Sequence, residues 1–436
     1  MKTAQQFLKT VYDSVEKRQD SYTELALAIA SADYIESAVA LSESAVFRRK
    51  HSSVSDALSE ASINKEQWIK ANGELFSETC ETLGDLEVYS GDSTFIKRTA
   101  AKTLEDRVMK RLSNKELAYG HELYWTTRLA EEKNSWAGVL LSERLAVEDT
   151  VTSMAAKHLK LIDGLNDNKK LYVLDAGHGK DVLKGYQDCQ NTDVVIRLKG
   201  HQKFFGRPSA RLPKSKGPDP IHGEEFKLSQ ASNPEQEQIL VYKGQKLRIS
   251  SWSQLHYQGF ADIHGRILKL EFLDDKGEPV FQKPIWLFTT STDISDEIIA
   301  RAYLWRTSHE LTFRFAKQHL ALTGNNSPNL TSCDNWYHSV ALAMNLLLSI
   351  RDHIKIESRA WYPQGNSKPS SQRQAQKQAL AFFLKFSSLI KPPQLGGKGS
   401  GRPSGLSPKP RPRHDVTRKT PKRVKKCSKC GHPASP

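Results

Sequence analysis

Hydrophobic residues recur at helical spacing through residues 1–84 and then give way to short runs of β-branched and aromatic residues. We therefore expect a helical N-terminal domain over residues 1–84. Within it the basic turn FRRK is followed by Ser52 and Ser53, either of which suits the N-cap of the next helix. This pattern predicts helices joined by a basic turn, which either bind a partner or pack on the rest of the chain.

Strand and helix patterns alternate over residues 85–200. A strand-forming run ends at Asp92, and two more strands follow, with Gly120 and Asn134 as expected breakers. An amphipathic helix then precedes a strand that is apolar on both faces and ends at Asp175; a helix and a strand complete the series. The predicted order is three strands, helix, strand, helix, strand. Acidic residues end the first and fourth strands, and the strand ends are where functional groups gather in α/β sheets.

Residues 201–283 interrupt this series with a loop rich in Pro, Gly and Lys, followed by several strand patterns. We expect a β-rich insertion there. Residues 284–390 return with one strand, a long helix and two further helices. Residues 391–436 consist largely of Lys, Arg, Pro, Gly and Ser, which predicts a disordered, basic tail.

A single helix is expected over Ile298–Leu320, which contains no Pro or Gly. At about 100° per residue, five polar side chains fall within about 80° of one another. A helix that is apolar over the rest of its circumference is a buried helix, so this polar stripe is expected to face a cleft. The alternative is a surface helix with ion pairs between residues four apart. The stripe consists of Tyr303, Arg306, Glu310, Arg314 and Lys317.

The charge balance favours an anionic partner, with nucleic acid ahead of membrane. Lys and Arg number 64 against 49 Asp and Glu, which gives a formal net charge of +15. No apolar run approaches the ~20 residues that span a bilayer, and the N-terminus lacks the apolar region of a secretory signal. The five cysteines are few and mostly scattered. We expect a cytoplasmic protein with reduced cysteines.

The spacing of Tyr303, Arg306, Glu310 and Lys317 reproduces the YREK motif of one large group of DDE transposases from bacterial insertion sequences. The chain therefore resembles an RNase H-like transposase over about residues 22–320. The resemblance implies an α/β fold: an RNase H-like catalytic core with a β-rich insertion, beside the N-terminal helical domain and the tail. It also implies cleavage through a DNA hairpin by a homodimer bound to DNA ends, in a protein that is nucleoid-associated when bound to DNA.

The same resemblance implies that Asp92, Asp175 and Glu310 are catalytic carboxylates. Phosphodiester cleavage and strand transfer use two divalent cations about 4 Å apart, and Mg²⁺ or Mn²⁺ prefers oxygen ligands. The three carboxylates would be the metal ligands. Each aspartate has alternatives: Asp92 also suits a turn, and its rival is Asp106, whereas the rivals of Asp175 are Asp188 and Asp193.

Tyr303, Arg306 and Lys317 would contact the terminal phosphate and its neighbours, as the matching residues of the family do. Arg gives bidentate phosphate contacts, whereas Lys acts as a point charge. Arg314 shares the stripe and either contacts DNA or pairs with Glu310. Trp252 in the insertion either stacks on an extruded base, as an insertion tryptophan does in this family, or packs in the core of the insertion.

Three further features stay open at this stage. Arg98 either contacts DNA near Asp92 or is solvated, and His178 is a hydrogen-bonded structural residue or a ligand. The pair Cys427 and Cys430 is half a zinc site, so bound Zn²⁺ would need further ligands. The candidates for these are His414, His432 or another chain.

The predicted function is a transposase that binds double-stranded DNA at the terminal inverted repeats of its element, cuts it and joins the end to target DNA. The helices of residues 1–84 would either bind the DNA end or support the core. The alternatives are a non-catalytic DNA-binding remnant and a Mg²⁺-dependent nuclease without strand transfer. The predicted domains are residues 1–84, 85–200 (core, first part), 201–283 (insertion), 284–390 (core, with the catalytic helix) and 391–436.

Overall fold

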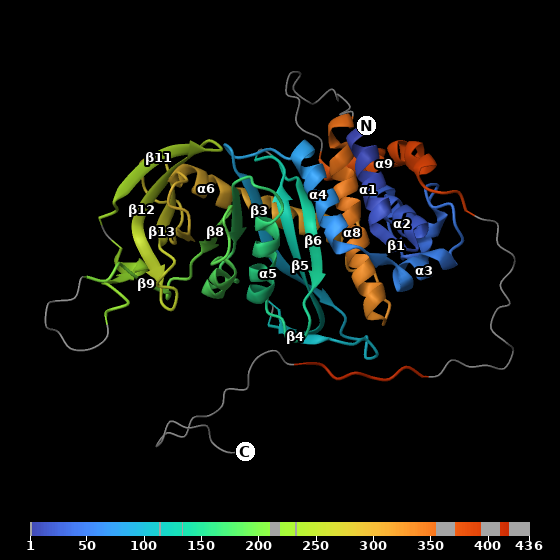
Figure 1. The fold of residues 1–436 in the computed structure, drawn as a ribbon, viewed down its shortest axis with the longest axis horizontal. Coiled ribbons are helices and arrows are strands. Elements are labelled where there is room, and N and C mark those ends of the chain that lie inside the picture. Colours follow the sequence, from blue (N-terminus) through green and yellow to red (C-terminus); the bar gives the residue numbers. More distant parts are fainter. Residues whose placement is uncertain are drawn as a thin grey trace, which may run out of the picture.

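The computed structural model of the chain describes residues 2–112, 115–132, 134–209, 219–231, 233–354, 371–393 and 410–417. Within these ranges, twelve strands form one large mixed sheet with helices on both of its faces (Figure 1). The protein therefore has a mixed α/β fold, as the alternation of patterns predicts.

Five strands form the centre of the sheet in the order β6-β5-β3-β7-β8. The pairs β3–β7 and β7–β8 are parallel, whereas β3–β5 and β5–β6 are antiparallel. A short strand, β4 (Val108–Arg111), pairs with the outer part of β5. The bounds of the five are β3 Glu87–Lys97, β5 Leu117–Leu129, β6 Ala137–Arg144, β7 Lys170–Leu174 and β8 Thr192–Arg197.

Alternate residues of β7 face two separate hydrophobic cores, as expected for a strand that is apolar on both faces. Leu171 and Val173 belong to the core that includes helix α6 (Asp296–Trp305), while Tyr172 and Leu174 belong to the core that includes α5 (Val151–Asp163). Between β7 and β8 the chain forms a 3-10 helix, η2 (Lys180–Gly185), in place of the α-helix predicted there.

Apart from α7, which packs over β3, β5 and β6, the remaining helices gather at one end of the sheet, to the right in Figure 1. The long helix α8 (Leu330–Ile350) is almost entirely buried; it packs on β6 and is surrounded by the N-terminal helices. Its burial on nearly all sides follows from a sequence that is apolar around most of the helix. The others are α1 Lys2–Ser14, α2 Gln19–Ser31, α3 Ser52–Glu60, α4 Lys65–Thr79, α7 Thr307–His319 and α9 Gln372–Phe386.

The predicted insertion supplies strands at the opposite end, and these continue the same sheet. Strand β14 (Ile285–Thr289) pairs with β8 on one side and with β13 (Gly265–Leu273) on the other. The hairpin of β11 (Gln236–Tyr242) and β12 (Gln245–Tyr257) turns at Lys243 and Gly244, which both have positive φ, as a tight hairpin turn requires. Short strands β9 (Lys203–Phe205) and β10 (Glu225–Lys227) extend the edge. The division into five domains stays a prediction.

Several local expectations were wrong. Gly120 does not break a strand: it lies inside β5, where a Cβ would meet the Ile96 carbonyl oxygen at 2.0 Å. Helix α3 begins at Ser52 after His51, so neither serine is its N-cap. The other short elements are β1 Val15–Lys17, β2 Ser62–Ile63, and the 3-10 helices η1 Val39–Glu43, η3 Leu228–Gln230, η4 Arg351–His353 and η5 Ser387–Leu389.

Part of the tail predicted to be disordered contacts the sheet. Thr417 exchanges backbone hydrogen bonds with Arg107 and Met109 beside β4, at 2.9 and 3.1 Å. His414 donates its backbone N–H to Lys102 and lies 3.6 Å from the Glu105 carboxylate. The unpaired edge of a strand explains this contact, because it offers backbone groups that composition does not reveal. Cys427, Cys430 and His432 lie outside the described residues.

Candidate active site

Asp92 and Asp175 lie side by side, one residue beyond the last paired position of two parallel strands. The register of β3 and β7 ends at the pair Gly91 and Leu174; Asp92 is the next residue of β3, and Asp175 directly follows the end of β7. The strand β3 continues to Lys97, so the prediction that it ends at Asp92 was wrong. Asp92 is nevertheless at an open position, because it is β7 that ends there.

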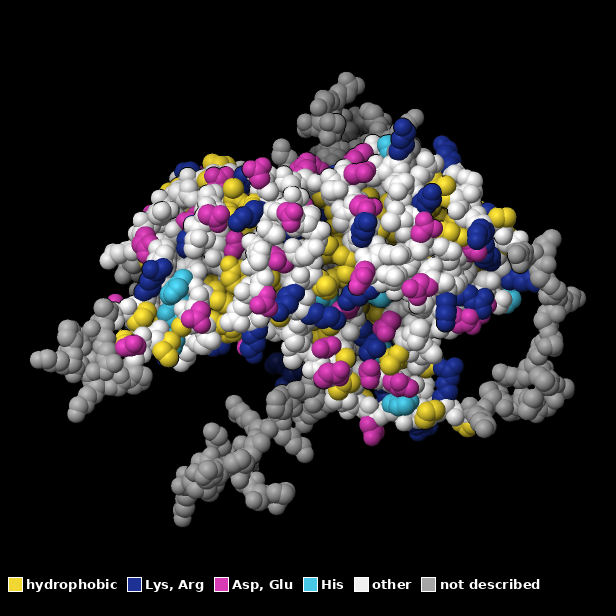
Figure 2. All heavy atoms as spheres, viewed as in Figure 1, with side chains coloured by type: hydrophobic (Ala, Val, Ile, Leu, Met, Phe, Trp, Pro, Cys, Tyr) yellow, Lys and Arg dark blue, Asp and Glu magenta, His cyan; other side chains and the backbone are white. Residues whose placement is uncertain are grey.

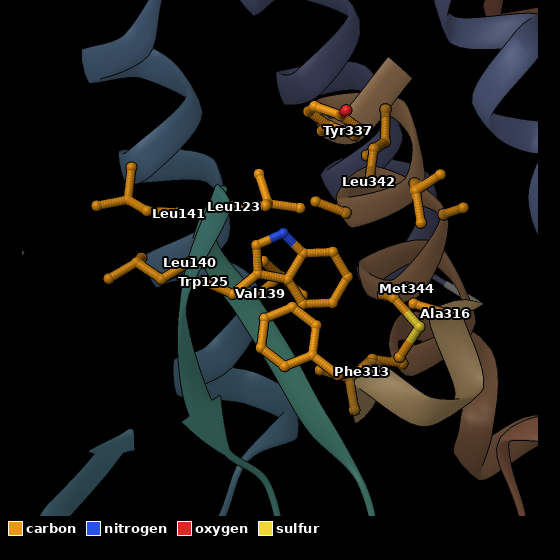
Figure 3. Close-up of a cluster of buried hydrophobic side chains, with 14 of the residues drawn as sticks. Leu123, Trp125, Val139, Leu140, Leu141, Phe313, Ala316, Tyr337, Leu342 and Met344 are labelled. Atoms are coloured by element: carbon orange, nitrogen blue, oxygen red, sulfur yellow. The ribbon is translucent and has the colours of Figure 1, made fainter. Parts of the chain in front are cut away.

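The predicted single helix Ile298–Leu320 is divided at Arg306 into α6 and α7. Both backbone bonds at the break span three residues: Arg306 N–H donates to Tyr303, and His309 N–H donates to Arg306. Such a tighter turn interrupts the α-helical pattern. On the sheet side of α7, Phe313 stacks on Trp125 with ring centroids 4.6 Å apart (Figure 3). Trp125 is the cross-strand partner of Asp92, so this contact holds α7 over the site.

The Arg306 guanidinium lies between two of the three predicted carboxylates. Its Nη2 is 2.5 Å from Glu310 Oε1, and its Nη1 is 3.5 Å from Asp92 Oδ2. The central guanidinium carbon of Arg306, Cζ, also lies 5.8 Å from the centre of the Tyr303 ring. The structure thus brings Asp92, Glu310, Arg306 and Tyr303 together, with Asp175 beside Asp92.

The two aspartates have pKa values pushed in opposite directions. Burial raises the pKa of Asp92, and the neighbouring charge of Asp175 raises it further, against the lowering effects of His178 and Arg306. For Asp175 burial also acts upward, but the hydrogen bond and charge of His178 and the bond from Gly177 outweigh it and lower the pKa to about 2. Paired carboxylates whose environments separate their pKa values are typical of active sites.

The exposed side of α7 carries the rest of the predicted stripe. Glu310, Arg314 and Lys317 are exposed, whereas Tyr303 is buried. Although the Lys317 residue is exposed as a whole, partial desolvation lowers its pKa. The charge of Asp92 acts to raise this pKa and the charge of Lys110 acts to lower it, so both lysines lie within electrostatic reach of the site. Within the described ranges Glu310 pairs with Arg306 and not with Arg314, which leaves Arg314 available to a ligand.

Other candidates are held in structural roles. Trp252 is only 7% exposed and contacts Phe226 and Trp286, which favours the alternative that it packs in the core of the insertion. The Arg98 side chain is buried and donates to the backbone carbonyls of Asn325 and Ser327. Each rival aspartate is occupied elsewhere: Asp106 by Arg144, Asp188 by Lys160, and Asp193 by Thr290 and Tyr186.

Two buried histidines lie beside these side chains: His178, predicted to be either a hydrogen-bonded structural residue or a ligand, and His309, for which the sequence predicted no role. His178 Nδ1 lies 2.7 Å from Asp175 Oδ1. His309 Nδ1 lies 2.8 Å from Thr127 Oγ1, and burial together with the charge of Arg306 lowers the pKa of His309 to about 3. Its Nε2 has no hydrogen-bond partner within the described part of the chain. For His309 the sequence offered one signal, a histidine on the apolar side of α7.

The donor set suits a hard divalent cation, although the present arrangement is incomplete. Asp92 and Asp175 are adjacent carboxylates, and burial together with their proximity raises the pKa of Asp92. A divalent cation between them would stabilise the ionised form of both. Glu310 is instead paired with Arg306. Within the described ranges no group of three or more His, Cys, Asp or Glu side chains lies close enough together to hold an ion. Asp92 and Asp175 are thus suited to bind a divalent cation, and Glu310 can join them only after it is released from Arg306.

Comparison with known proteins adds little. No family model and no curated protein matches the chain. Among solved structures it is similar to the cryo-EM structure of a piggyBac transposase synaptic complex with hairpin DNA, at 8% identity and a TM-score of 0.41. The match covers 88% of this chain and 78% of that chain. A similarity this low assigns neither fold nor function, and it does not bear on the bacterial group to which the YREK residues point.

No helix in the described part of the chain is both long and apolar enough to cross a membrane. On the face seen in Figure 2, basic and acidic side chains are interspersed over the surface. The positive net charge of the whole chain is therefore not gathered into one patch on this face.

Proposed function

We propose that the chain is a DDE transposase with an RNase H-like core, of the YREK type found in bacterial insertion sequences. One observation carries this proposal: Asp92 and Asp175 are neighbours just beyond the paired part of β3 and β7, and Arg306 at the start of α7 links Asp92 to Glu310. The strand order β6-β5-β3-β7-β8, with its three parallel strands, supports the RNase H-like assignment.

Asp92 and Asp175, joined by Glu310, would hold two Mg²⁺ or Mn²⁺ ions. When bound, such ions activate the attacking oxygen and stabilise the leaving oxygen of a phosphodiester. The chain itself contributes the fixed carboxylates and the neighbouring cations. Arg306 is the residue that must change partners: a DNA phosphate offers its guanidinium a bidentate partner in place of Glu310 and Asp92.

Lys317, Arg314 and Tyr303 would contact the phosphates next to the cleaved bond, because they share the stripe with Arg306. The substrates would be double-stranded DNA at the terminal inverted repeats and target DNA, handled by a homodimer in the cytoplasm. The base-stacking role of Trp252 stays a prediction and would need that side chain to leave its contacts with Phe226 and Trp286.

The test compares cleavage and joining of the DNA that flanks the coding sequence by the full chain and by Glu310→Gln, with Mg²⁺. We expect the variant to bind this DNA normally and to cleave it at least about a hundredfold more slowly. The matched control is Glu297→Gln, since Glu297 is similarly exposed and also pairs with an arginine four residues away. Unchanged cleavage by Glu310→Gln would contradict the assignment of the catalytic helix.

A second candidate function follows from the position of Arg306. If Arg306 keeps its ion pairs to Asp92 and Glu310 when DNA binds, the protein would bind DNA ends without cutting them. Binding without cleavage in wild type and variant would favour this DNA-binding remnant. Cleavage without joining to a second DNA would instead indicate a nuclease.

A further inference from the structure

A continuous chain of buried hydrogen bonds leads from Asp175 across the sheet to Glu143. Its five intermediate members are each at most 1% exposed. They come from the loop after β7, from β5, from β7 itself and from α5, so nothing in the local sequence groups them. In order, the links are Asp175–His178 (2.7 Å), His178–Tyr124 (3.1 Å), Tyr124–Tyr172 (2.8 Å), Tyr172–Thr126 (3.2 Å), Thr126–His158 (2.8 Å) and His158–Glu143 (3.0 Å).

At the Asp175 end, this series of hydrogen bonds reaches one carboxylate oxygen, Oδ1. His178 Nδ1 and the backbone N–H of Gly177 both lie against Oδ1, at 2.7 and 2.9 Å. With Oδ1 held by two donors, Oδ2 is the oxygen left for a ligand. A side chain at Gly177 would crowd this carboxylate, because a Cβ there would lie 3.0 Å from Oδ1. The loop therefore fixes the rotation of the carboxylate as well as its position.

The imidazole of His178 is held at both ring nitrogens, Nδ1 by Asp175 and Nε2 by the Tyr124 hydroxyl. The Tyr124 and His178 rings also form a T-shaped pair with centroids 5.8 Å apart, and the His178 backbone carbonyl accepts a bond from Thr152 in α5. At the far end, Lys157 lies 3.1 Å from Glu143, and Lys65 also pairs with it. Burial alone would raise the pKa of Glu143, but the bond and charge of His158 and the charge of Lys65 lower it overall. The series of hydrogen bonds thus ends on the Glu143 carboxylate, which is firmly ionised and held by His158 and two lysines.

We propose that His178 is a positioning residue for Asp175, and that the buried hydroxyls behind it keep the imidazole in place. The affinity of the Asp92–Asp175 pair for a divalent cation then depends on side chains that never touch the ion. This rests on the proposed function, which makes the pair a metal site. Partners that orient a ligand side chain are known to change metal affinity about 10- to 100-fold when removed.

The first experiment measures Mn²⁺ binding to the full chain by calorimetry, without DNA, for three substitutions of His178. Asparagine keeps an N–H near the position of Nδ1, whereas glutamine places it near Nε2 and alanine removes both. We expect Mn²⁺ affinity to fall about tenfold or more in His178→Ala and His178→Gln, and within about threefold in His178→Asn. A merely structural role gives no reason for asparagine to rescue the site better than glutamine.

The second experiment removes one hydroxyl from the middle of the chain. Tyr124→Phe leaves His178 Nε2 without its partner, and we expect Mn²⁺ affinity to fall about three- to tenfold. Tyr257→Phe is the matched control, since Tyr257 is equally buried and its hydroxyl has no partner in the described part of the chain. It should leave Mn²⁺ affinity unchanged. Urea unfolding of each variant shows that the protein measured is folded.

Asp175→Asn separates the two proposals. If it abolishes Mn²⁺ binding while His178→Ala binds as wild type does, the metal site stands and the positioning role is overturned. Equal losses in His178→Asn and His178→Gln would also overturn it. If Asp175→Asn binds Mn²⁺ as wild type does, the pair is not a metal site, and both proposals fail.

Discussion

Replacement of Asp92 by asparagine should abolish DNA cleavage and, without divalent cations, make the protein more stable. The cleavage rate should fall at least about a thousandfold, because one of the two central ligands is lost. The free energy of unfolding should rise by about 0.5 to 2 kcal/mol, as is common when a functional site is relieved of unfavourable charge. Burial and the neighbouring charge of Asp175 both disfavour the ionised form of Asp92. Asparagine removes that cost, and Arg306 keeps Glu310 as its partner.

The pH dependence follows from the raised pKa of Asp92. The folded state takes up a proton at a higher pH than the unfolded state, whose aspartates titrate near about 3.9. In wild type, the cost of ionising Asp92 lowers the free energy of unfolding. This cost is complete above the pKa that Asp92 has in the folded state, and it disappears as the pH falls to about 4. The stability advantage of Asp92→Asn should vanish below about pH 4 and grow as the pH rises toward the raised pKa of Asp92. Urea unfolding across this range measures it.

Adding Mn²⁺ should reverse the order of stability. An ion that binds only the folded state stabilises wild type in proportion to the logarithm of its concentration, and Asp92→Asn should gain little. Asp188→Asn is the control, because Asp188 is exposed and its ion pair within the described residues is with surface Lys160; its effect should stay within about 0.5 kcal/mol. An Asp92→Asn protein that cleaves DNA like wild type, or that is clearly less stable without Mn²⁺, would contradict this prediction.

The parts of the site that lie at the ends of hydrophobic runs could be predicted from sequence. Asp175 follows a strand with no polar interruption, and that strand ends where its apolar run ends. The spacing on α6 and α7 likewise predicted that Arg306 and Glu310 share one side. Such features depend on residues close in sequence, and periodicity reports on those.

What could not be predicted depends on contacts between distant segments. The openness of Asp92 is set by the length of β7, not by its own strand, which continues to Lys97. The position of His178 depends on the hydroxyls of Tyr124 in β5 and Tyr172 in β7. In the sequence, nothing distinguishes these two residues from other strand tyrosines. The break at Arg306 has no Pro or Gly to announce it, and it accompanies the ion pairs that Arg306 makes with Asp92 and Glu310.

Gly91 is the position where the fold and the site constrain each other most closely. It precedes Asp92 on β3, and its missing side chain would point to the opposite face of the sheet. There the hydroxyls of Tyr124 and Tyr172 lie 2.8 Å apart, and a Cβ on Gly91 would fall 2.1 and 2.2 Å from them. These rings are fully buried, so neither can move aside cheaply.

Gly91→Ala should therefore destabilise the protein by about 3 kcal/mol or more, the upper range for overpacking of a rigid core. It should also reduce Mn²⁺ affinity, because displaced tyrosines no longer hold His178, and a shift of β3 moves Asp92. Gly73→Ala is the opposite case: Gly73 lies within α4, and a Cβ there would meet nothing within 4 Å. That variant should be more stable by about 0.5 to 1 kcal/mol. If urea unfolding shows Gly91→Ala and Gly73→Ala shifted in the same direction, the close approach of the two tyrosines to β3 is wrong, and with it the middle of the hydrogen-bond series from Asp175 to Glu143.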